Sequence, residues 1–319
     1  MNIEKLVGNT PMIKINYEYE GKLGSIYTKL EFYNFTGSIK DRMALYIIQT
    51  ERENGNLSEG QPIVEVTSGN TGISFSAIGG LLGHDVHIFM PDWVSLERRK
   101  LIEMYGAHVH LISKEEGGFK KALELADEFA KEINAYKPLQ FDNELNVEAQ
   151  YKTTGKEIID ALPNVNAFVS GIGTGGTLMG IGKKLKDNNP NSIIIALEPS
   201  TLSILKMGME EGTHMIEGLG DDFIPGIIDE DLIDDIVLID DCDAINMSKR
   251  IAKEFGLGIG ISGGANFLAS VLMDSDELNI ATVFPDDNKK YITTRLSEKV
   301  DENPKLLSNK VKLIDFEVI

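Results

Sequence analysis

One lysine stands where a helix is expected to begin, just after a run of small and hydroxyl-bearing residues. The segment 36–42 (TGSIKDR) follows a strand expected at 25–31, and a helical pattern starts near Gly37. Lys40 would then lie in the first helical turn, where the helix dipole disfavours a cation. A lysine that is also partly desolvated there has a lowered pKa and can serve as an amine nucleophile. The alternative for Lys40 is an ordinary solvated side chain.

A turn rich in hydroxyl and amide groups follows the strand expected at 62–67. Residues 67–72 (TSGNTG) place the hydroxyls of Thr67, Ser68 and Thr71 around the amide of Asn70. Backbone N–H groups that cluster at a helix N-terminus form a nest for an anion, and a carboxylate suits it as well as a phosphate. Capping of a tight turn is the structural alternative for the same residues.

A glycine-rich loop follows the strand expected at 167–170. Residues 171–177 (GIGTGGT) also satisfy the dinucleotide pattern G-x-G-x-x-G, and Glu198 ends the next expected strand about 20 residues further on. These features alone would indicate a nicotinamide oxidoreductase with Glu198 on the ribose. A cradle for a phosphate monoester explains the loop as well. Thr174 and Thr177 add hydroxyl donors that a pyrophosphate turn does not need.

The elements that must position these segments alternate between strands and helices. Further strands are expected at 85–90, 108–112, 193–197, 236–239 and 281–284, as near-continuous apolar runs typical of parallel strands buried on both faces. A helix is expected over 119–133, with an apolar face of Ala122, Leu123, Leu125, Ala126, Phe129 and Ile133. The alternation predicts an α/β fold, in which ligands bind at the carboxyl ends of strands. The closing run 311–319 is not assigned to an element.

Length and composition exclude several classes of protein. A chain of 319 residues is long enough for two lobes, and a formal net charge of -19 makes nucleic acid and anionic membrane surfaces poor partners. Cys242 is the single cysteine, so an internal disulfide is impossible and a reducing compartment fits. No signal peptide is recognised, and no apolar run approaches the roughly 20 residues that span a bilayer. A cytoplasmic protein is therefore expected.

Together, the three motifs resemble those of one enzyme family. Their order and spacing are similar to those of cysteine synthase and cystathionine β-synthase, which are fold-type II pyridoxal-phosphate enzymes related to the tryptophan synthase β subunit. The resemblance covers nearly the whole chain and includes LVGNTP (6–11), SLERR (95–99), QFDN (140–143), TTG (153–155), GLG (218–220), FIP (223–225) and PD (285–286). It implies two α/β lobes around the cofactor, each a mostly parallel twisted sheet flanked by helices. The smaller, mobile lobe would be 41–144, and the larger, cofactor-anchoring lobe would be 1–40 with 145–319.

The resemblance also implies a role for each matching residue. Lys40 would carry pyridoxal 5'-phosphate as an imine and later move the α-proton of the substrate. The cofactor would further contact Asn70 at its ring hydroxyl oxygen, Ser262 at its pyridine nitrogen, and a phosphate cradle of Gly173, Thr174, Gly175, Gly176 and Thr177. The substrate carboxylate would be held by Thr67, Ser68, Gly69, Thr71 and Gln140, and no metal is implied. Because a serine hydroxyl does not hold the pyridine protonated, elimination at the β-carbon is favoured over transamination.

These roles imply β-replacement in cysteine metabolism through an aminoacrylate intermediate. Synthesis, which joins O-acetylserine to sulfide and gives L-cysteine, ranks first because most relatives perform it. The alternative reaction starts from cysteine, expels hydrogen sulfide, and adds water or a thiol to give serine, lanthionine or cystathionine. Asp221 and Asp222 favour this alternative, since a carboxylate there could act as a general base and would repel hydrosulfide. Otherwise the two are solvated loop acids.

Two other classes of protein are distinguished from this enzyme by simple observations. A nicotinamide oxidoreductase would respond to NAD and would leave Lys40 and the 67–72 turn without a role. A non-catalytic relative that acts as a binding partner would be expected to lack Lys40, which is present. The resemblance further implies a homodimer.

Overall fold

The computed structural model describes residues 2–209, 211–220 and 223–319, so Asp221 and Asp222 lie outside the described residues. Its strands are β1 (Met12–Tyr19), β2 (Lys22–Leu30), β3 (Ile63–Val66), β4 (Val86–Pro91), β5 (His108–Ile112), β6 (Ala167–Gly171), β7 (Ile193–Pro199), β8 (Asp235–Ile239), β9 (Ile280–Phe284) and β10 (Val311–Val318). They form a seven-stranded sheet in the order β10-β1-β2-β9-β6-β7-β8 and a three-stranded sheet in the order β3-β4-β5.

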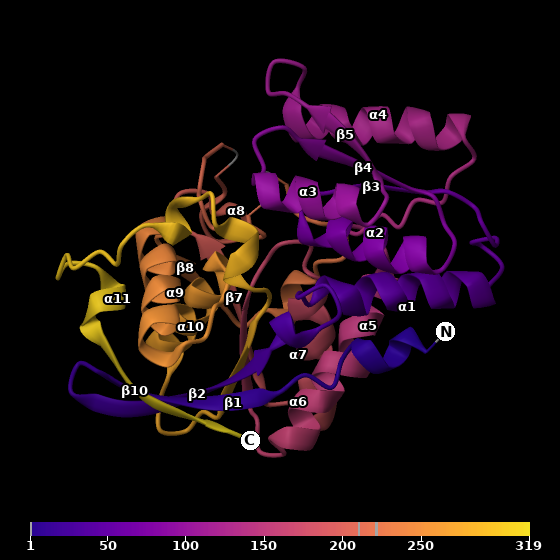
Figure 1. Ribbon diagram of the computed structural model, residues 1–319. Helices are drawn as coiled ribbons and strands as arrows, with labels where there is room; N and C mark the ends of the chain where they lie inside the picture. The colour runs from indigo at the N-terminus through magenta and orange to yellow at the C-terminus, as the bar shows by residue number, and fades with distance from the viewer. Residues whose placement is uncertain (1, 210, 221–222) are drawn as a thin grey trace.

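Helices connect most of these strands and cover both sheets (Figure 1). They are α1 (Lys40–Glu53), α2 (Asn70–Leu81), α3 (Leu96–Met104), α4 (Gly118–Glu132), α5 (Glu144–Gln150), α6 (Lys156–Ala161), α7 (Gly176–Asn188), α8 (Ile204–Met207), α9 (Asp241–Phe255), α10 (Ile261–Met273) and α11 (Leu307–Lys310). A π-helical turn, Tyr151–Gly155, joins α5 to α6. Among the described residues, no helix has the length and apolarity needed to cross a membrane.

The central strands of the larger sheet, β6, β7 and β9, are buried on both faces. Ile195 and Leu197 of β7 pack with α9 and α10, whereas Ile194 and Ala196 of the same strand pack with α7 on the opposite face. Strands β2, β9, β6, β7 and β8 are parallel to one another, as the apolar runs predict. Parallel strands need helical crossovers, and the loop that follows each strand therefore lies at the carboxyl edge of the sheet.

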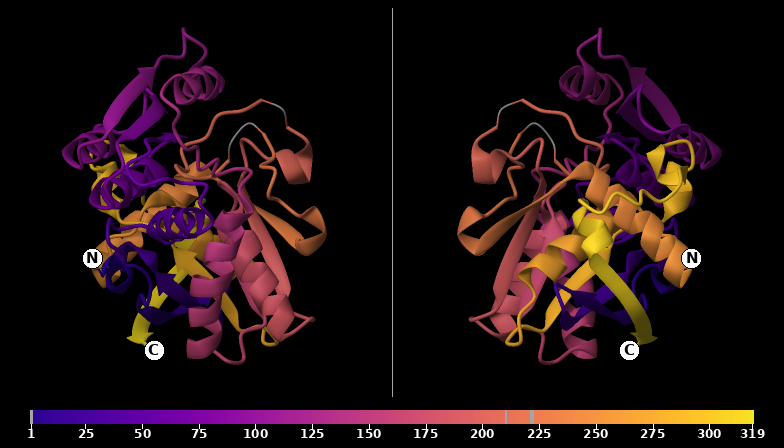
Figure 2. Two further views of the ribbon diagram at one scale, coloured as in Figure 1. Left: turned by 90° about the vertical axis from the view of Figure 1, so that its right-hand side faces the viewer. Right: turned by 90° about the vertical axis from the view of Figure 1, so that its left-hand side faces the viewer.

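The smaller sheet is wholly parallel and has its own two layers of helices. Ile88 of β4 packs with α1 and α2, and the next residue, Phe89, packs beneath α4. The buried face of α4 is centred on Ala122 and Ala126, and Leu123 is 37% exposed although its spacing assigned it to that face. In both views of Figure 2, α4 and the smaller sheet lie at the top, away from the C-terminal strand at the bottom.

The α/β class and the eight expected strands are confirmed, and two strands were missed. β1 pairs antiparallel with β2 through a two-residue turn at Glu20 and Gly21, which both have positive φ. The unassigned tail forms β10, which pairs antiparallel with β1 at the edge of the sheet. The helix expected near Gly37 begins at Lys40 instead, since Gly37 has a φ of 81°. The lobe boundaries at 41–144 stay a prediction.

Candidate active site

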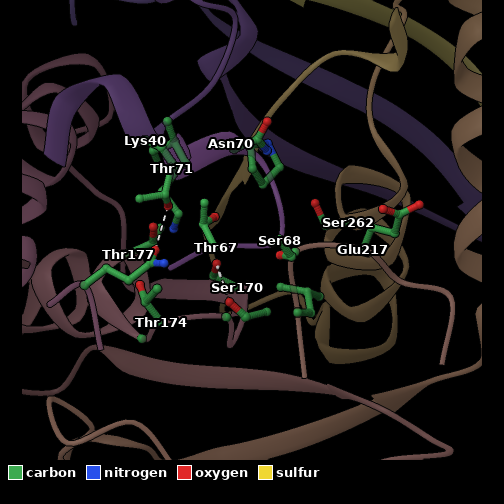
Figure 3. A pocket seen from close by; sticks show the side chains of 18 of the residues that line it. Lys40, Thr67, Ser68, Asn70, Thr71, Ser170, Thr174, Thr177, Glu217 and Ser262 are labelled. Atoms are coloured by element: carbon green, nitrogen blue, oxygen red, sulfur yellow. Dashed lines mark hydrogen bonds between the residues drawn. The ribbon is translucent and has the colours of Figure 1, made fainter. Parts of the chain in front are cut away.

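One pocket gathers the three segments that the sequence singles out. Lys40 of α1, the turn that leads into α2, the loop between β6 and α7, and the first turn of α10 meet there (Figure 3). The predicted site residues that line the pocket are Lys40, Thr67, Ser68, Asn70, Thr71, Gln140, Gly173, Thr174, Gly175, Thr177 and Ser262. The other two described ones, Gly69 and Gly176, pack beside it against Arg98 and Asn146.

The first turn of α1 is held in place by the residue next to Lys40. The buried carboxylate of Asp41 accepts hydrogen bonds from the backbone N–H of Thr36 at 2.6 Å, from the Thr36 hydroxyl at 2.5 Å and from the Ser74 hydroxyl at 2.7 Å. Burial raises the pKa of Asp41, against the lowering effect of these three donors. α1 is thereby tied to α2, which follows the 67–72 turn. The lowered pKa of Lys40 stays a prediction.

A buried ion network fastens the same turn to the larger sheet. The Arg42 side chain is fully buried and bonds Glu31 at 2.6 and 2.8 Å and Glu157 at 2.6 and 2.8 Å. Lys29 bonds Glu157 at 2.6 Å. Burial alone raises the pKa of Glu157, but the hydrogen bonds and charge of Arg42, with the charge of Lys29, lower it to about 2. Lys40 is thus carried by a helix whose first turn is anchored on both sides.

The 67–72 turn is braced from below by Gln140. The Thr71 hydroxyl donates to Gln140 Oε1 at 2.6 Å, and Gln140 Nε2 donates to the Val66 carbonyl at 2.7 Å. The backbone N–H of Gly69 donates to the Thr67 hydroxyl oxygen at 3.0 Å. The turn lies at the N-terminus of α2, which is the positive end of the helix dipole. Its backbone N–H groups are therefore suited to bind an anion in the pocket.

The glycine-rich loop leaves no room for side chains at two positions. An added Cβ at Gly173 would lie 2.4 Å from the backbone oxygen of Gly218, and one at Gly176 would lie 2.1 Å from Asn146 Oδ1. Gly175 has a φ of 91°, which side chains rarely tolerate. Asn146 Nδ2 donates to the Thr174 hydroxyl at 2.9 Å and to the Gln140 carbonyl at 2.8 Å. One amide therefore joins the glycine loop to the residue that braces the 67–72 turn.

Alanine at Gly173 is expected to displace this loop, because the Gly218 carbonyl is backbone and cannot move aside as a side chain would. We expect the affinity for a phosphate-bearing ligand to fall by at least about tenfold, measured by equilibrium dialysis. Gly80→Ala is the matched control. An added Cβ there meets only Tyr105 O at 3.5 Å, and alanine stabilises a helix by about 0.5–1 kcal/mol over glycine. Unchanged binding in Gly173→Ala would remove the loop from the binding site.

Glu198, the residue that a ribose would require, is engaged elsewhere. Its carboxylate accepts from the Ser203 hydroxyl at 2.6 Å and from the backbone N–H groups of Ile204 and Leu205 at 3.0 and 2.9 Å. It caps α8 and is 7% exposed. The dinucleotide interpretation of the glycine-rich loop is therefore wrong, because Glu198, the acid that it requires on a ribose, caps α8 instead.

Ser262 reaches the pocket from the first turn of α10, where it is 4% exposed. α10 is positioned by Asn266, one turn further along. Asn266 Oδ1 accepts from the backbone N–H of Gly171 at 2.9 Å, and Asn266 Nδ2 donates to the Val283 carbonyl at 2.9 Å. Asn266 thus locks the helix that carries Ser262 to the start of the glycine loop.

Sequence reasoning missed four charged or phenolic residues at this site. Asn70 Nδ2 donates to Asp286 Oδ2 at 2.7 Å, and the Tyr291 hydroxyl also donates to Asp286, whose pKa is raised by burial. On another wall Arg98 donates to the Ser68 carbonyl at 2.9 Å and pairs with Glu217. Asp286 belongs to the PD motif (285–286) and Arg98 to the SLERR motif (95–99), and the family resemblance assigned neither residue a role. No local pattern marks Glu217 or Tyr291.

Comparisons with known proteins place this geometry in a family. A family profile described as "Pyridoxal-phosphate dependent enzyme" matches residues 3–286. A cysteine synthase of Staphylococcus aureus is 38% identical over 301 residues, covering 92% of this chain and 96% of that protein. The crystal structure of a hydrogen sulfide-producing enzyme from Fusobacterium nucleatum has a TM-score of 0.95 and 46% identity, covering 99% and 97% of the two chains. A cysteine synthase from Entamoeba histolytica has a TM-score of 0.87 and 32% identity, covering 97% and 95%.

Proposed function

The chain belongs to the family of pyridoxal-phosphate dependent enzymes, as a cysteine synthase-like member, and on that premise we propose that it releases hydrogen sulfide from L-cysteine. The observation that carries the proposal is its greater likeness, in identity and in TM-score, to the sulfide-producing enzyme from Fusobacterium nucleatum than to the cysteine synthase from Entamoeba histolytica. Water or a second thiol would complete the replacement.

The residues present fit the cofactor that the family implies. Gly173, Gly175 and Gly176 let the loop backbone pack closely against Gly218, Ile228 and Asn146, and the loop lies at the N-terminus of α7, where backbone N–H groups can bind a phosphate. Asn70 Oδ1 is buried and has no hydrogen-bond partner among the described residues, so a polar ligand group can satisfy it. When bound, pyridoxal phosphate supplies the electron sink that allows a proton to leave the α-carbon of an amino acid.

Each side of the pocket then has a separate task. We assign the substrate carboxylate to the hydroxyls and N–H groups of 67–71, which Gln140 keeps in place. Lys40 Nζ would hold the cofactor and move the α-proton, because it enters the same pocket from the first turn of α1. Ser262 would contact the pyridine nitrogen, and as a neutral group it favours loss of the β-substituent over transamination.

Synthesis of cysteine from O-acetylserine and sulfide is the second candidate function. The curated relatives named cysteine synthase favour it, and they cover almost the whole chain. The two directions share the binding residues, so they differ in which leaving group and which nucleophile the pocket prefers.

One experiment separates the two functions. The purified holoenzyme is supplied with L-cysteine alone, and sulfide release is measured. In parallel it receives O-acetylserine with sulfide, and cysteine formation is measured. We expect the larger kcat/KM with cysteine alone. A larger value for cysteine formation would reject the proposal in favour of synthesis, and Lys40→Ala, as the control, should lose both activities.

Three further features of the family resemblance are kept as proposals. We propose that the chain forms a homodimer, is cytoplasmic, and closes the lobe 41–144 over a bound amino acid. Light scattering of the purified protein would test the dimer, since a monomer at micromolar concentration would contradict it. Closure is tested by small-angle scattering with and without substrate, and an unchanged radius of gyration would count against it.

A further inference from the structure

A cluster of histidines lies on the smaller sheet, at the opposite end of its strands from the pocket. Three of the five histidines of the chain gather there, and two of them, His87 and His108, contact the carboxylate of Asp85. His87 of β4 and His108 of β5 are partners across the parallel ladder, and His110 follows two residues later on the same face. Asp85 directly precedes β4, and His108 is the first residue of β5. Asp85, His87 and His108 therefore lie at the amino ends of β4 and β5, whereas the 67–72 turn of the pocket follows the carboxyl end of β3 in the same parallel sheet.

The polar atoms of this cluster converge at distances typical of metal ligands. Asp85 Oδ2 lies 3.3 Å from His87 Nε2, and Asp85 Oδ1 lies 3.1 Å from His108 Nε2. One ligand atom from each of the three residues lies within 4.8 Å of the others. Around a tetrahedral zinc ion with bonds of about 2.0–2.1 Å, neighbouring ligand atoms are about 3.3 Å apart. The two Asp85 distances are close to this spacing, one through each carboxylate oxygen.

The rings are arranged so that both Nε2 atoms face the same carboxylate. The rings of His87 and His108 stack with centroids 4.6 Å apart and an interplanar angle of 17°. Convergence on one ion requires a tilt of His108, whose side chain is 57% exposed and therefore has room to turn. His87 is the preorganised ligand, since its side chain is only 12% exposed and its ring packs against Phe129.

A second layer of contacts orients the His87 ring. His87 Nδ1 lies 3.2 Å from His110 Nε2, so when a metal ion replaces the contact of His87 Nε2 with Asp85, the ring proton can reside on Nδ1 and be donated to His110. His110 is itself held in a stack on Phe89, with ring centroids 4.3 Å apart. In metalloproteins, the N–H of the second ring nitrogen of a ligating histidine almost always donates a hydrogen bond to a neighbouring acceptor.

We infer that Asp85, His87 and His108 form a binding site for a divalent transition metal ion of the zinc and nickel class, with His110 as the residue that orients His87. Two imidazoles and one carboxylate suit these ions, whereas magnesium and calcium take oxygen ligands. The fourth position would be taken by water, because the cluster lies at the protein surface. A bound ion would link the start of β4 to the start of β5, which is the edge strand of this sheet.

Calorimetric titration of the holoenzyme with zinc chloride, after chelator treatment and its removal, tests the site. At neutral pH we expect one saturable equivalent, no saturable heat with magnesium, and a higher unfolding midpoint with zinc present. His108→Ala and Asp85→Asn should each weaken zinc binding by at least about tenfold, and His110→Ala should weaken it by a similar factor through loss of orientation.

Two control variants separate this site from adventitious binding. Asp127→Asn removes a carboxylate of the same lobe that is 51% exposed, close to the 54% of Asp85, and should bind zinc as the wild type does. Cys242→Ser removes the single thiol and should also leave binding unchanged. Absence of a saturable equivalent in the wild type would overturn the inference. So would wild-type affinity in both His108→Ala and Asp85→Asn.

Discussion

Replacement of Lys40 by alanine is expected to reduce sulfide release from cysteine by about a thousandfold. We propose that the Lys40 side chain both holds the cofactor and moves the α-proton. Loss of a positioned base alone lowers the reaction rate by a factor of about 10²–10⁴. No other lysine lines the described part of the pocket, so none is placed to substitute for it. The measurement is steady-state sulfide release, together with the visible absorbance of the purified protein, which should change because the amine proposed to bind the cofactor is gone.

A matched control and a rescue experiment make this prediction specific. Lys289→Ala removes a lysine whose side chain is 81% exposed, and it should retain wild-type activity. A small primary amine added to Lys40→Ala should restore part of the activity, since it replaces the missing base and not the fold. Activity within tenfold of the wild type in Lys40→Ala would show that another group moves the proton.

Substitution of Arg42 by methionine is expected to lower the free energy of unfolding by about 3–5 kcal/mol, as for other broken buried ion pairs. The cause is the buried negative charge of Glu31, which loses its partner when Arg42 is replaced. Glu31 is 0% exposed, and the attraction of Arg42 lowers its pKa against a burial that would raise it. Without Arg42, Glu31 must either take up a proton or remain charged in a medium of low dielectric. Denaturant unfolding monitored by circular dichroism provides the measurement.

A double variant tests whether the buried charge is the cause. Arg42→Met combined with Glu31→Gln removes one positive and one negative charge together, while Lys29 and Glu157 still neutralise each other at 2.6 Å. We expect the double variant to be more stable than Arg42→Met alone, because no unpaired charge then remains buried. A double variant that is less stable than the single one would mean that hydrogen bonding or packing, and not charge, determines the cost.

The fold could be predicted where the pattern was local. Parallel strands such as β6 and β7 are buried on both faces, so each is a continuous apolar run that stands out between two turns. β1 and β10 are antiparallel, and their apolar and polar residues alternate, with Ile13 paired to Val318 across almost the whole chain. Nothing within either segment indicates a partner at the opposite terminus, so the sequence pattern does not assign the tail to an element.

The same distinction between local patterns and long-range contacts applies to the candidate site. Thr67–Thr71 and Gly171–Thr177 are recognisable because an anion nest needs glycine, hydroxyls and a following helix within a few residues. Glu217, Arg98, Asp286 and Tyr291 meet the site from distant segments, and their contacts with Ser68 and Asn70 exist only after folding. Glu198 shows the opposite case, since its sequence position indicated a ribose contact and its fold position makes it a helix cap.

The sequence by itself therefore determined the α/β class, the three segments that line the pocket, and Lys40 as the candidate nucleophile. Each of these depends on residue types within a short window, where backbone conformation and helix dipoles act. The tertiary structure alone decided which buried charges brace those loops, how the terminal strands pair, and that Asp85, His87 and His108 share one corner of the smaller sheet. These depend on contacts between residues far apart in the chain, which short-range physics does not specify.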